Sequence, residues 1–244
     1  SRFFDVKDPD IFTLTTTYKD NAYLTDRDIE YYERMKEVNP MRFRVAGQGE
    51  WGITEGLLYN FTDQNILHEL DKYIDFSAGI DYGIKKDAYS ISVIGYTANY
   101  KEAHIIREYY HSNDKSLNKK THNDYIDDTM AFFKELDIVL DVYIDNSAAF
   151  LVEFLNERTF KEQFFKPRFH ECKKLHIEER VGYVSGLIDE GKLKISTDCP
   201  NHINEYTNIE IAEVASKVRQ GSDHAIDSSE YALTPYFKLL VKEY

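Results

Sequence analysis

The sequence predicts an α/β protein with one mixed sheet, made of three antiparallel strands and then parallel strands, flanked by helices. Three strand-like segments follow one another through short connections between residues 76 and 110, which is typical of an antiparallel meander. After residue 124, helical segments alternate with short apolar segments, which is typical of parallel strands joined by helices. The 244 residues, 42 % of them hydrophobic, suffice for one large domain, with or without an appendage.

Residues 1 to about 50 differ in pattern from the rest of the chain. The β-branched segment 12–18 (FTLTTTY) predicts a strand. Thr25 is placed to cap a helix, and Asp28, three residues later, can complete a capping box. That helix should run to about Glu37 and end before Pro40.

The meander and the elements after it follow from hydrophobic periodicity. The three strands are expected at 76–83 (FSAGIDYG), 89–96 (YSISVIGY) and 103–110 (AHIIREYY). In the segment 124–136, Ile126, Met130 and Phe133 share one helical face. The later elements are expected as a strand at 139–144, a helix at 148–155, a weak strand at 169–173, a helix at 177–190 ended by Gly191, a strand at 193–196, a helix at 201–206, an ambiguous segment at 209–218 and a helix at 223–233.

The formal net charge of the chain is -13. A uniformly acidic protein is repelled by phosphate backbones, so the composition argues against avid, unaided binding of nucleic acid. Two arrangements would reconcile the charge with a nucleic-acid partner. Some carboxylates could bind divalent metal ions, or a separate basic surface or subunit could hold the nucleic acid.

The chain has two cysteines, Cys172 and Cys199, which argues against a disulfide framework and favours a reducing cytosol. No apolar run approaches the ~20 residues needed to span a bilayer. The polar start, SRFFDVKDPD, is no signal peptide, so we expect no secretion and no membrane association. Because the chain begins without Met, we expect a fragment of a longer protein. Zinc on Cys172, His176, Cys199 and His202 is disfavoured, since their spacing fits no standard finger.

Two carboxylates follow strand-like segments of the predicted sheet. Asp81 lies in GIDYG and Asp145 in YIDNSA, each at the carboxyl end of its strand. Functional groups of open α/β sheets gather at such ends. Two carboxylates side by side repel each other, and a divalent cation such as Mg²⁺ or Mn²⁺ removes the conflict. A single Asp at a strand end is more often a turn former. The prediction of a metal site therefore depends on Asp81 and Asp145 occurring together.

A third group of polar residues lies in GSDHAIDSSEYAL, residues 221–233. His224 and Asp227 are three residues apart and share a helical face, so either or both can complete a metal site. Asp223 lies near the helix start, where it can instead act as the cap. His224 could also be an ordinary surface histidine.

Together with these acidic segments, two further stretches resemble large terminase subunits, the DNA-packaging motors of phages. TTTYKDNAYL (residues 15–24) is similar to the end of their ATPase region, and GEWGITEGLLYNF (residues 49–61) to the segment leading into their nuclease domain. GIDYG, YIDNSA and DHAIDSSEYAL resemble the three acidic motifs of that nuclease. The element order is also that of the ribonuclease H-like fold. The resemblance implies that residues 1–55 are a remnant of the ATPase region and linker, and that residues 56–244 form a ribonuclease H-like nuclease domain.

The resemblance implies an endonuclease that cuts concatemeric double-stranded viral DNA during packaging in the host cytoplasm. Asp81, Asp145 and Asp227 would be catalytic; Asp81, Asp145, His224, Asp227 and Asp223 are the candidate metal ligands, and Asp87 falls where some relatives carry an accessory acidic residue. Two Mg²⁺ or Mn²⁺ ions about 4 Å apart would then act on the scissile phosphate. The portal protein and the small terminase subunit would be partners. Glu230 departs from the family, in which Arg is frequent at that position, and no G-x-x-x-x-G-K-[ST] motif is present.

Basic residues near the predicted site are candidate phosphate contacts, although solvated surface side chains would give the same pattern. They are Lys85, Lys86, Lys173, Lys174, Arg180 and Lys192. Two other functions fit the residues less well. Another ribonuclease H-like nuclease, such as a resolvase or integrase, would carry no ATPase remnant. A non-catalytic docking module of a packaging motor would show no stabilisation by metal.

Overall fold

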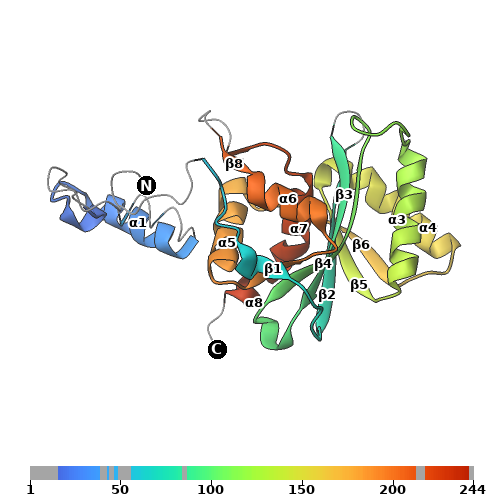
Figure 1. Ribbon diagram of the computed structural model, residues 1–244, viewed down its shortest axis with the longest axis horizontal. Helices are drawn as coiled ribbons and strands as arrows, with labels where there is room; N and C mark the ends of the chain where they lie inside the picture. Colours follow the sequence, from blue (N-terminus) through green and yellow to red (C-terminus); the bar gives the residue numbers. More distant parts are fainter. Residues whose placement is uncertain are drawn as a thin grey trace. The chain divides into compact units, whose positions relative to one another are not determined.

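The computed structural model describes residues 16–38, 43, 47–48, 56–83, 87–212 and 218–241. The chain divides into two compact units, Ser1–Glu55 and Gly56–Tyr244. The larger unit holds the sheet and its helices (Figure 1).

The small unit is built around α1, Asp26–Val38. The backbone N–H of Thr25 donates to the Asp28 carboxylate at 2.9 Å, and the N–H of Asp28 donates to the Thr25 hydroxyl at 3.3 Å. The predicted capping box and helix are therefore confirmed. The predicted strand is wrong at its end, because Tyr18 begins a short 3-10 turn, Tyr18–Asp20; residues 12–15 lie outside the described part of the chain.

In the described part of the large unit, one sheet has seven strands in the order β1-β7-β4-β3-β2-β5-β6. The central strands β2, β3 and β4 are antiparallel neighbours, and β5 continues the sheet parallel to β2. The remaining pairs, β5–β6, β4–β7 and β7–β1, are parallel. The predicted mixed sheet is thereby confirmed. Its strands are β1 (Ile66–Leu67), β2 (Asp75–Asp81), β3 (Ala88–Tyr96), β4 (Ala103–Ser112), β5 (Leu140–Ile144), β6 (Pro167–Glu171) and β7 (Leu193–Ser196).

Helices cover both faces of the sheet (Figure 1). One apolar core joins the sheet to α3 (His122–Leu136) and α4 (Ala149–Lys161). The other core joins the opposite face to α5 (Ile177–Asp189), α6 (Pro200–Asn208), α7 (His224–Leu233) and α8 (Phe237–Leu240). The ambiguous segment after α6 begins with β8 (Glu210–Ile211), which pairs with β9 (Arg219–Gln220). None of the helices in the described residues is long and apolar enough to cross a membrane.

Helix α7 packs directly on the backbone of β2 because residue 79 has no side chain. A Cβ at Gly79 would lie 1.9 Å from the Ser228 carbonyl oxygen and 2.8 Å from the Ala232 nitrogen. Buried hydroxyls hold α7 against the neighbouring strand β3 as well, since Ser228 Oγ lies 2.9 Å from Ser90 Oγ and 2.5 Å from Ser92 Oγ. Helix α7 is thus held against both β2 and β3.

Candidate active site

Asp81 and Asp145 lie at the carboxyl ends of neighbouring strands, as expected from the sequence. Asp81 is the last residue of β2, and Asp145 directly follows β5. The two strands run parallel with Ile80 opposite Ile144, so the next residue of each strand is one of the two acids. Their side chains are 16 % and 18 % exposed, which leaves both accessible from one edge of the sheet.

His224, the first residue of α7, reaches the Asp81 carboxylate. Its Nδ1 lies 2.9 Å from Asp81 Oδ2. Burial raises the pKa of Asp81 to about 6, and the charge of Asp227 adds to this, while His224 partly offsets it. Burial alone would lower the pKa of His224, but the hydrogen bond and charge of Asp81 outweigh it, and the net pKa is raised. The carboxylate of Asp81 is therefore disfavoured mainly by its burial.

Tyr231 and Lys174 surround the Asp145 carboxylate. The Tyr231 hydroxyl donates to Asp145 Oδ2 at 3.0 Å, and Lys174 Nζ donates to the same oxygen at 2.7 Å. Burial works to raise the pKa of Asp145, but Lys174 outweighs it and holds the pKa below its usual range. Burial raises the pKa of the Tyr231 hydroxyl, and the charges of Asp227, Asp81 and Asp145 raise it further. Of the three acids, Asp145 is the one that the Tyr231 hydroxyl contacts.

Asp227 is tied to two buried arginines. Arg180 Nη1 donates to Asp227 Oδ1 at 2.6 Å, and Arg219 Nη2 donates to the same oxygen at 2.7 Å. Burial works to raise the pKa of Asp227, but the two guanidiniums outweigh it, so the pKa is lowered. Glu230 completes this network: it is fully buried, contacts Arg180 and accepts from Arg219 Nη1 at 2.8 Å. At position 230, this chain thus has an acid that is neutralised by arginines from α5 and β9.

The other two predicted ligands are placed differently. Asp223 occupies the N-cap position of α7, but its side chain makes no cap hydrogen bond and accepts from Arg219 Nε at 2.9 Å. Asp87 is exposed and directly precedes β3. Among the described residues, Asp87 takes no part in the hydrogen bonds of Asp81, Asp145 or Asp227.

Within the described residues, no group of three or more His, Cys, Asp or Glu side chains is arranged to hold a metal ion. Two of the acids have cationic partners instead. The Lys174 ammonium lies at Oδ2 of Asp145, and the Arg180 and Arg219 guanidiniums lie at Oδ1 of Asp227.

The fold of this chain is similar to that of known proteins. Residues 1–50 match the model of the family described as phage terminase large subunit. The nuclease domain of the P22 large terminase superposes with a TM-score of 0.55 at 11 % identity, over 77 % of this chain and 98 % of that domain. The large terminase nuclease of thermophilic phage G20c with bound magnesium superposes with a TM-score of 0.52 at 14 % identity, over 75 % of this chain and 98 % of that chain. The chain has the fold of a large terminase nuclease domain.

The likeness extends to a longer terminase. The large terminase of another thermophilic bacteriophage superposes with a TM-score of 0.67 at 21 % identity, over 90 % of this chain. The present chain spans 55 % of the length of that terminase. None of the curated proteins compared matches the sequence. The predicted resemblance to a large terminase nuclease, and the ribonuclease H-like sheet that it implied, are confirmed at the level of the fold.

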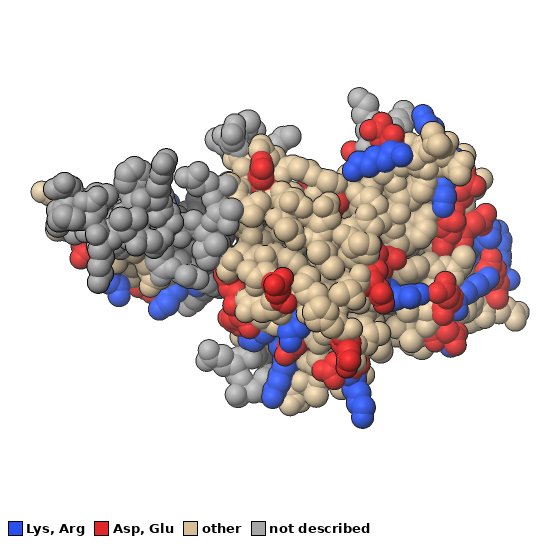
Figure 2. All heavy atoms as spheres, viewed as in Figure 1, with Lys and Arg blue, Asp and Glu red and all other residues tan. Residues whose placement is uncertain are grey.

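The basic residues predicted to flank this terminase-like site have different environments. Arg180 departs from the prediction of a phosphate contact: it is 3 % exposed and its guanidinium is bound to Asp227 and Glu230. Lys174 is bound to Asp145, and Lys192 to Glu190 at 2.6 Å. Lys173 is exposed, and Lys85 and Lys86 lie outside the described residues. Figure 2 shows Lys and Arg side chains lying among Asp and Glu on the viewed face.

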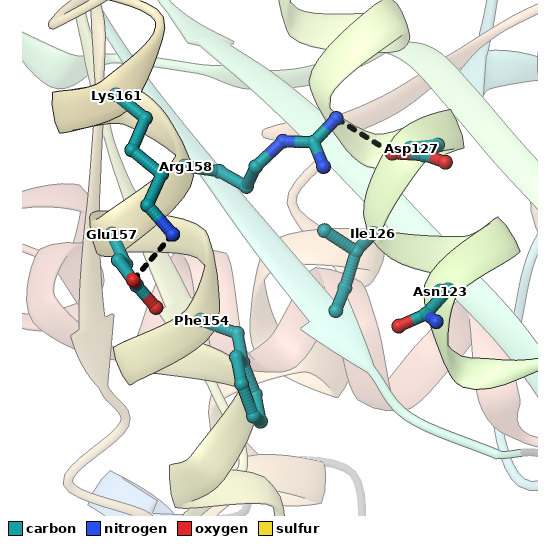
Figure 3. Close-up of a pocket in the computed structure, with 7 residues that line it drawn as sticks. All are labelled: Asn123, Ile126, Asp127, Phe154, Glu157, Arg158 and Lys161. Carbon is teal, nitrogen blue, oxygen red and sulfur yellow. Dashed lines mark hydrogen bonds and ion pairs between the residues drawn. The ribbon is translucent and has the colours of Figure 1, made fainter.

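Two hollows differ in their relation to the acids. A pocket of about 350 Å³ between α3 and α4 lies in the helix layer on the other face of the sheet from α7, and its charged residues are paired with each other (Figure 3). A cleft of about 720 Å³ is lined in part by Asp141 and Tyr143 of β5, the strand that Asp145 follows, but Asp145 itself does not line it. Its lining also includes Arg168, His170 and Lys173.

Sequence reasoning missed two neighbours of the acids: Tyr231, which contacts Asp145, and Arg219, which contacts Asp227. No spacing in the sequence connects them to Asp81 or Asp145, because the tertiary fold brings residues together that are far apart along the chain. A signal for the burial of Arg180 did exist. It lies on the apolar stripe of α5, four residues before Val184 and seven before Leu187, both of which are buried.

Proposed function

We propose that this chain is the nuclease part of a phage DNA-packaging motor, a metal-dependent endonuclease that cleaves concatemeric double-stranded DNA. The observation that carries the proposal is the convergence of Asp81, Asp145 and the start of α7. His224 contacts Asp81, and Tyr231 of the same helix contacts Asp145. The fold supports the same function, because the P22 and G20c domains that share it are terminase nucleases.

The donor atoms fit a hard divalent cation. Asp81 and Asp145 offer carboxylate oxygens, and His224 adds an imidazole. Such an ion would favour the charged form of the buried Asp81 carboxyl. At Asp145, the Lys174 ammonium already supplies a positive charge beside the carboxylate. We propose Asp81, Asp145 and His224 as ligands of Mg²⁺ or Mn²⁺; the G20c nuclease carries bound magnesium.

A second ion would need Asp227, with Asp223 beside it. Both carboxylates are bound by Arg219, and Asp227 is also bound by Arg180. Both guanidiniums bind the same Asp227 oxygen, Oδ1, so a second ion would have to bind Asp227 through Oδ2 or displace an arginine. Two such ions, when bound, lower the pKa of the attacking water and stabilise the leaving 3′ oxygen.

The residues of the chain orient these acids before any ion binds. His224 fixes one oxygen of Asp81, and Tyr231 and Lys174 fix one oxygen of Asp145. The backbone N–H of Ser147 donates to the other oxygen of Asp145 at 3.0 Å. The two candidate ligands are thus held at the same edge of the sheet, where a shared metal ion would have to lie within coordination reach of both.

Double-stranded DNA would reach the acids from the cleft beside β5. Arg168, His170 and Lys173 line it and could contact phosphates, although Arg168 and His170 are now paired with Asp141. The net charge of -13 disfavours avid binding by the domain alone. We therefore propose that the packaging assembly, with portal protein and small terminase subunit in the host cytoplasm, holds the DNA. Residues 1–55 would be the end of the ATPase region of that motor.

Nicking of supercoiled plasmid in Mn²⁺ tests the proposed function. We expect the wild-type chain to nick and Asp81→Ala to be inactive while remaining folded. Asp127→Ala is a matched control, since Asp127 is an exposed aspartate on α3 that pairs with Arg158, in the other helix layer. Retained cutting by a folded Asp81→Ala protein would remove Asp81 from the mechanism. A wild-type chain that neither nicks nor gains melting temperature in Mn²⁺ would instead be a docking module.

A further inference from the structure

Helix α7, which carries His224 and Asp227, lacks a cap of its own. Asp223 is at the N-cap position, but its carboxylate binds Arg219 instead of the helix backbone. The first turn of a helix leaves backbone N–H groups without partners inside the helix. Ala225 and Ile226 are fully buried, so these N–H groups need a protein acceptor.

That acceptor is the carboxylate of Glu205, which comes from α6. Its Oε2 accepts from the N–H of Ala225 at 2.7 Å and from the N–H of Ile226 at 3.2 Å. Its Oε1 accepts from the hydroxyls of Tyr110 at 3.0 Å and Ser222 at 2.9 Å. Glu205 is 4 % exposed, and its negative charge lies at the positive end of the α7 dipole.

The two N–H groups that Glu205 binds lie between the two candidate site residues. Ala225 directly follows His224, and Ile226 directly precedes Asp227. The Glu205 carboxylate therefore fixes the backbone of the turn that aims His224 at Asp81 and Asp227 at its arginines. Without this cap the first turn would be free to shift. His224 is the first residue of that turn, so its contact with Asp81 would shift as well.

Glu205 belongs to α6, and the first turn of α6 is also capped by a carboxylate from another element. The carboxylate of Glu108, from β4, accepts from the N–H groups of Asn201 at 3.0 Å and His202 at 3.1 Å in the first turn of α6. It also lies 2.6 Å from His202 Nδ1. Two buried carboxylates thus hold successive helices, and the second of them holds the helix of the site.

We infer that Glu205 is a positioning residue of the nuclease site, which sets the first turn of α7 so that His224 meets Asp81. The inference rests on the proposed function. It assigns Glu205 no contact with metal or DNA, only the placement of residues that make such contacts.

Glu205→Gln tests the inference, because an amide has one acceptor oxygen and must point its NH₂ group at another donor. We expect a folded protein in which the Mn²⁺ concentration for half-maximal nicking rises about 10- to 100-fold, with KM for DNA unchanged. The rise of melting temperature caused by Mn²⁺ should shrink in parallel. Thr121→Ala, which removes the cap of α3 far from the site, is the control and should leave the Mn²⁺ requirement unchanged.

The possible outcomes separate the two proposals. If wild type nicks and is stabilised by Mn²⁺ while Glu205→Gln has the same Mn²⁺ requirement, Glu205 is only a structural cap and the inference fails alone. If wild type does neither, the proposed function fails and the inference with it. If Glu205→Gln does not fold, the double variant Tyr110→Phe, Ser222→Ala retains the carboxylate but removes both donors to its Oε1. It should raise the Mn²⁺ requirement severalfold, and an unchanged requirement would overturn the inference.

Discussion

The imidazole Nδ1 of His224 lies 2.9 Å from Oδ2 of Asp81, although the two residues are 143 positions apart in the sequence. This contact joins the first turn of α7 to the end of β2. It brings a basic side chain to a carboxylate that burial and the nearby Asp227 would otherwise leave poorly neutralised.

Asp81→Asn should stabilise the metal-free protein at pH 8. The pKa of Asp81 in the folded protein, about 6, lies above its ordinary 3.8, so its contribution to stability is present below pH 3.8 and is lost as the pH rises through 6. The neutral amide avoids that loss, and we expect a gain of about 1–3 kcal/mol in the free energy of unfolding at pH 8, shrinking below pH 4. Urea unfolding in EDTA measures it; a clear loss of stability at pH 8 would contradict the raised pKa of Asp81.

Lys174→Met should increase the affinity for Mn²⁺. The Lys174 ammonium binds Asp145 Oδ2 in the absence of an ion, so it competes for an oxygen that the ion needs. Because the Lys174 side chain is 37 % exposed, we expect only about a two- to fivefold lower Kd for Mn²⁺, measured by calorimetry. Lys166→Met is a suitable control, since Lys166 pairs with Asp137 at 2.6 Å away from the acids. Weaker Mn²⁺ binding by Lys174→Met would show that Lys174 supports the ion instead.

Gly79→Ala should displace α7 from β2. The added Cβ meets backbone atoms of α7, with 1.9 Å to the Ser228 oxygen, and a helix backbone cannot move as a side chain can. We expect the free energy of unfolding to fall by at least about 1–3 kcal/mol, and the Mn²⁺-dependent rise in melting temperature to be lost. Gly95→Ala is the comparison, because its Cβ would meet the Tyr73 ring, a side chain, and it should retain that rise. If Gly79→Ala kept the wild-type rise in melting temperature with Mn²⁺, the close contact of α7 with β2 would not be needed for metal binding.

Glu108→Gln should reduce the acid sensitivity of the fold. Burial works to raise the pKa of Glu108, but the hydrogen bond and charge of His202 outweigh it, so the pKa is below its ordinary 4.5. A lowered carboxyl pKa contributes stability above pH 4.5 that is lost as the pH falls through the folded-state pKa. The variant should be less stable at pH 7 by about 1–3 kcal/mol and should lose less on acidification. Parallel pH profiles of unfolding for the two proteins would contradict this role.

Much of the fold followed from local pattern. Alternation in YSISVIGY predicted β3, the strand-like segment AHIIREYY predicted β4, and Asp81 and Asp145 were expected at the carboxyl ends of their strands. These signals are local because side chains alternate along a strand. β1 was not predicted, since two residues, Ile66 and Leu67, are too few to show alternation.

The environment of the acids could not be predicted in the same way. The sequence suggested that Asp223 caps α7, but the cap is supplied by Glu205 from another helix, and Asp223 binds Arg219. Arg180 was expected to contact phosphates, yet it lies buried against Glu230. Such ion pairs join residues far apart in the chain, and no periodicity records them. The departure at Glu230 was visible in the sequence, but its two arginine partners were not.

Anomalous diffraction from a crystal soaked in Mn²⁺ tests the central claim most directly. We expect a manganese peak within about 2.0–2.3 Å of carboxylate oxygens from both Asp81 and Asp145, with the Lys174 ammonium displaced from Asp145. Manganese bound elsewhere, or a soaked crystal in which Lys174 still occupies Asp145 and no peak lies between the two acids, would contradict a nuclease site at this edge of the sheet.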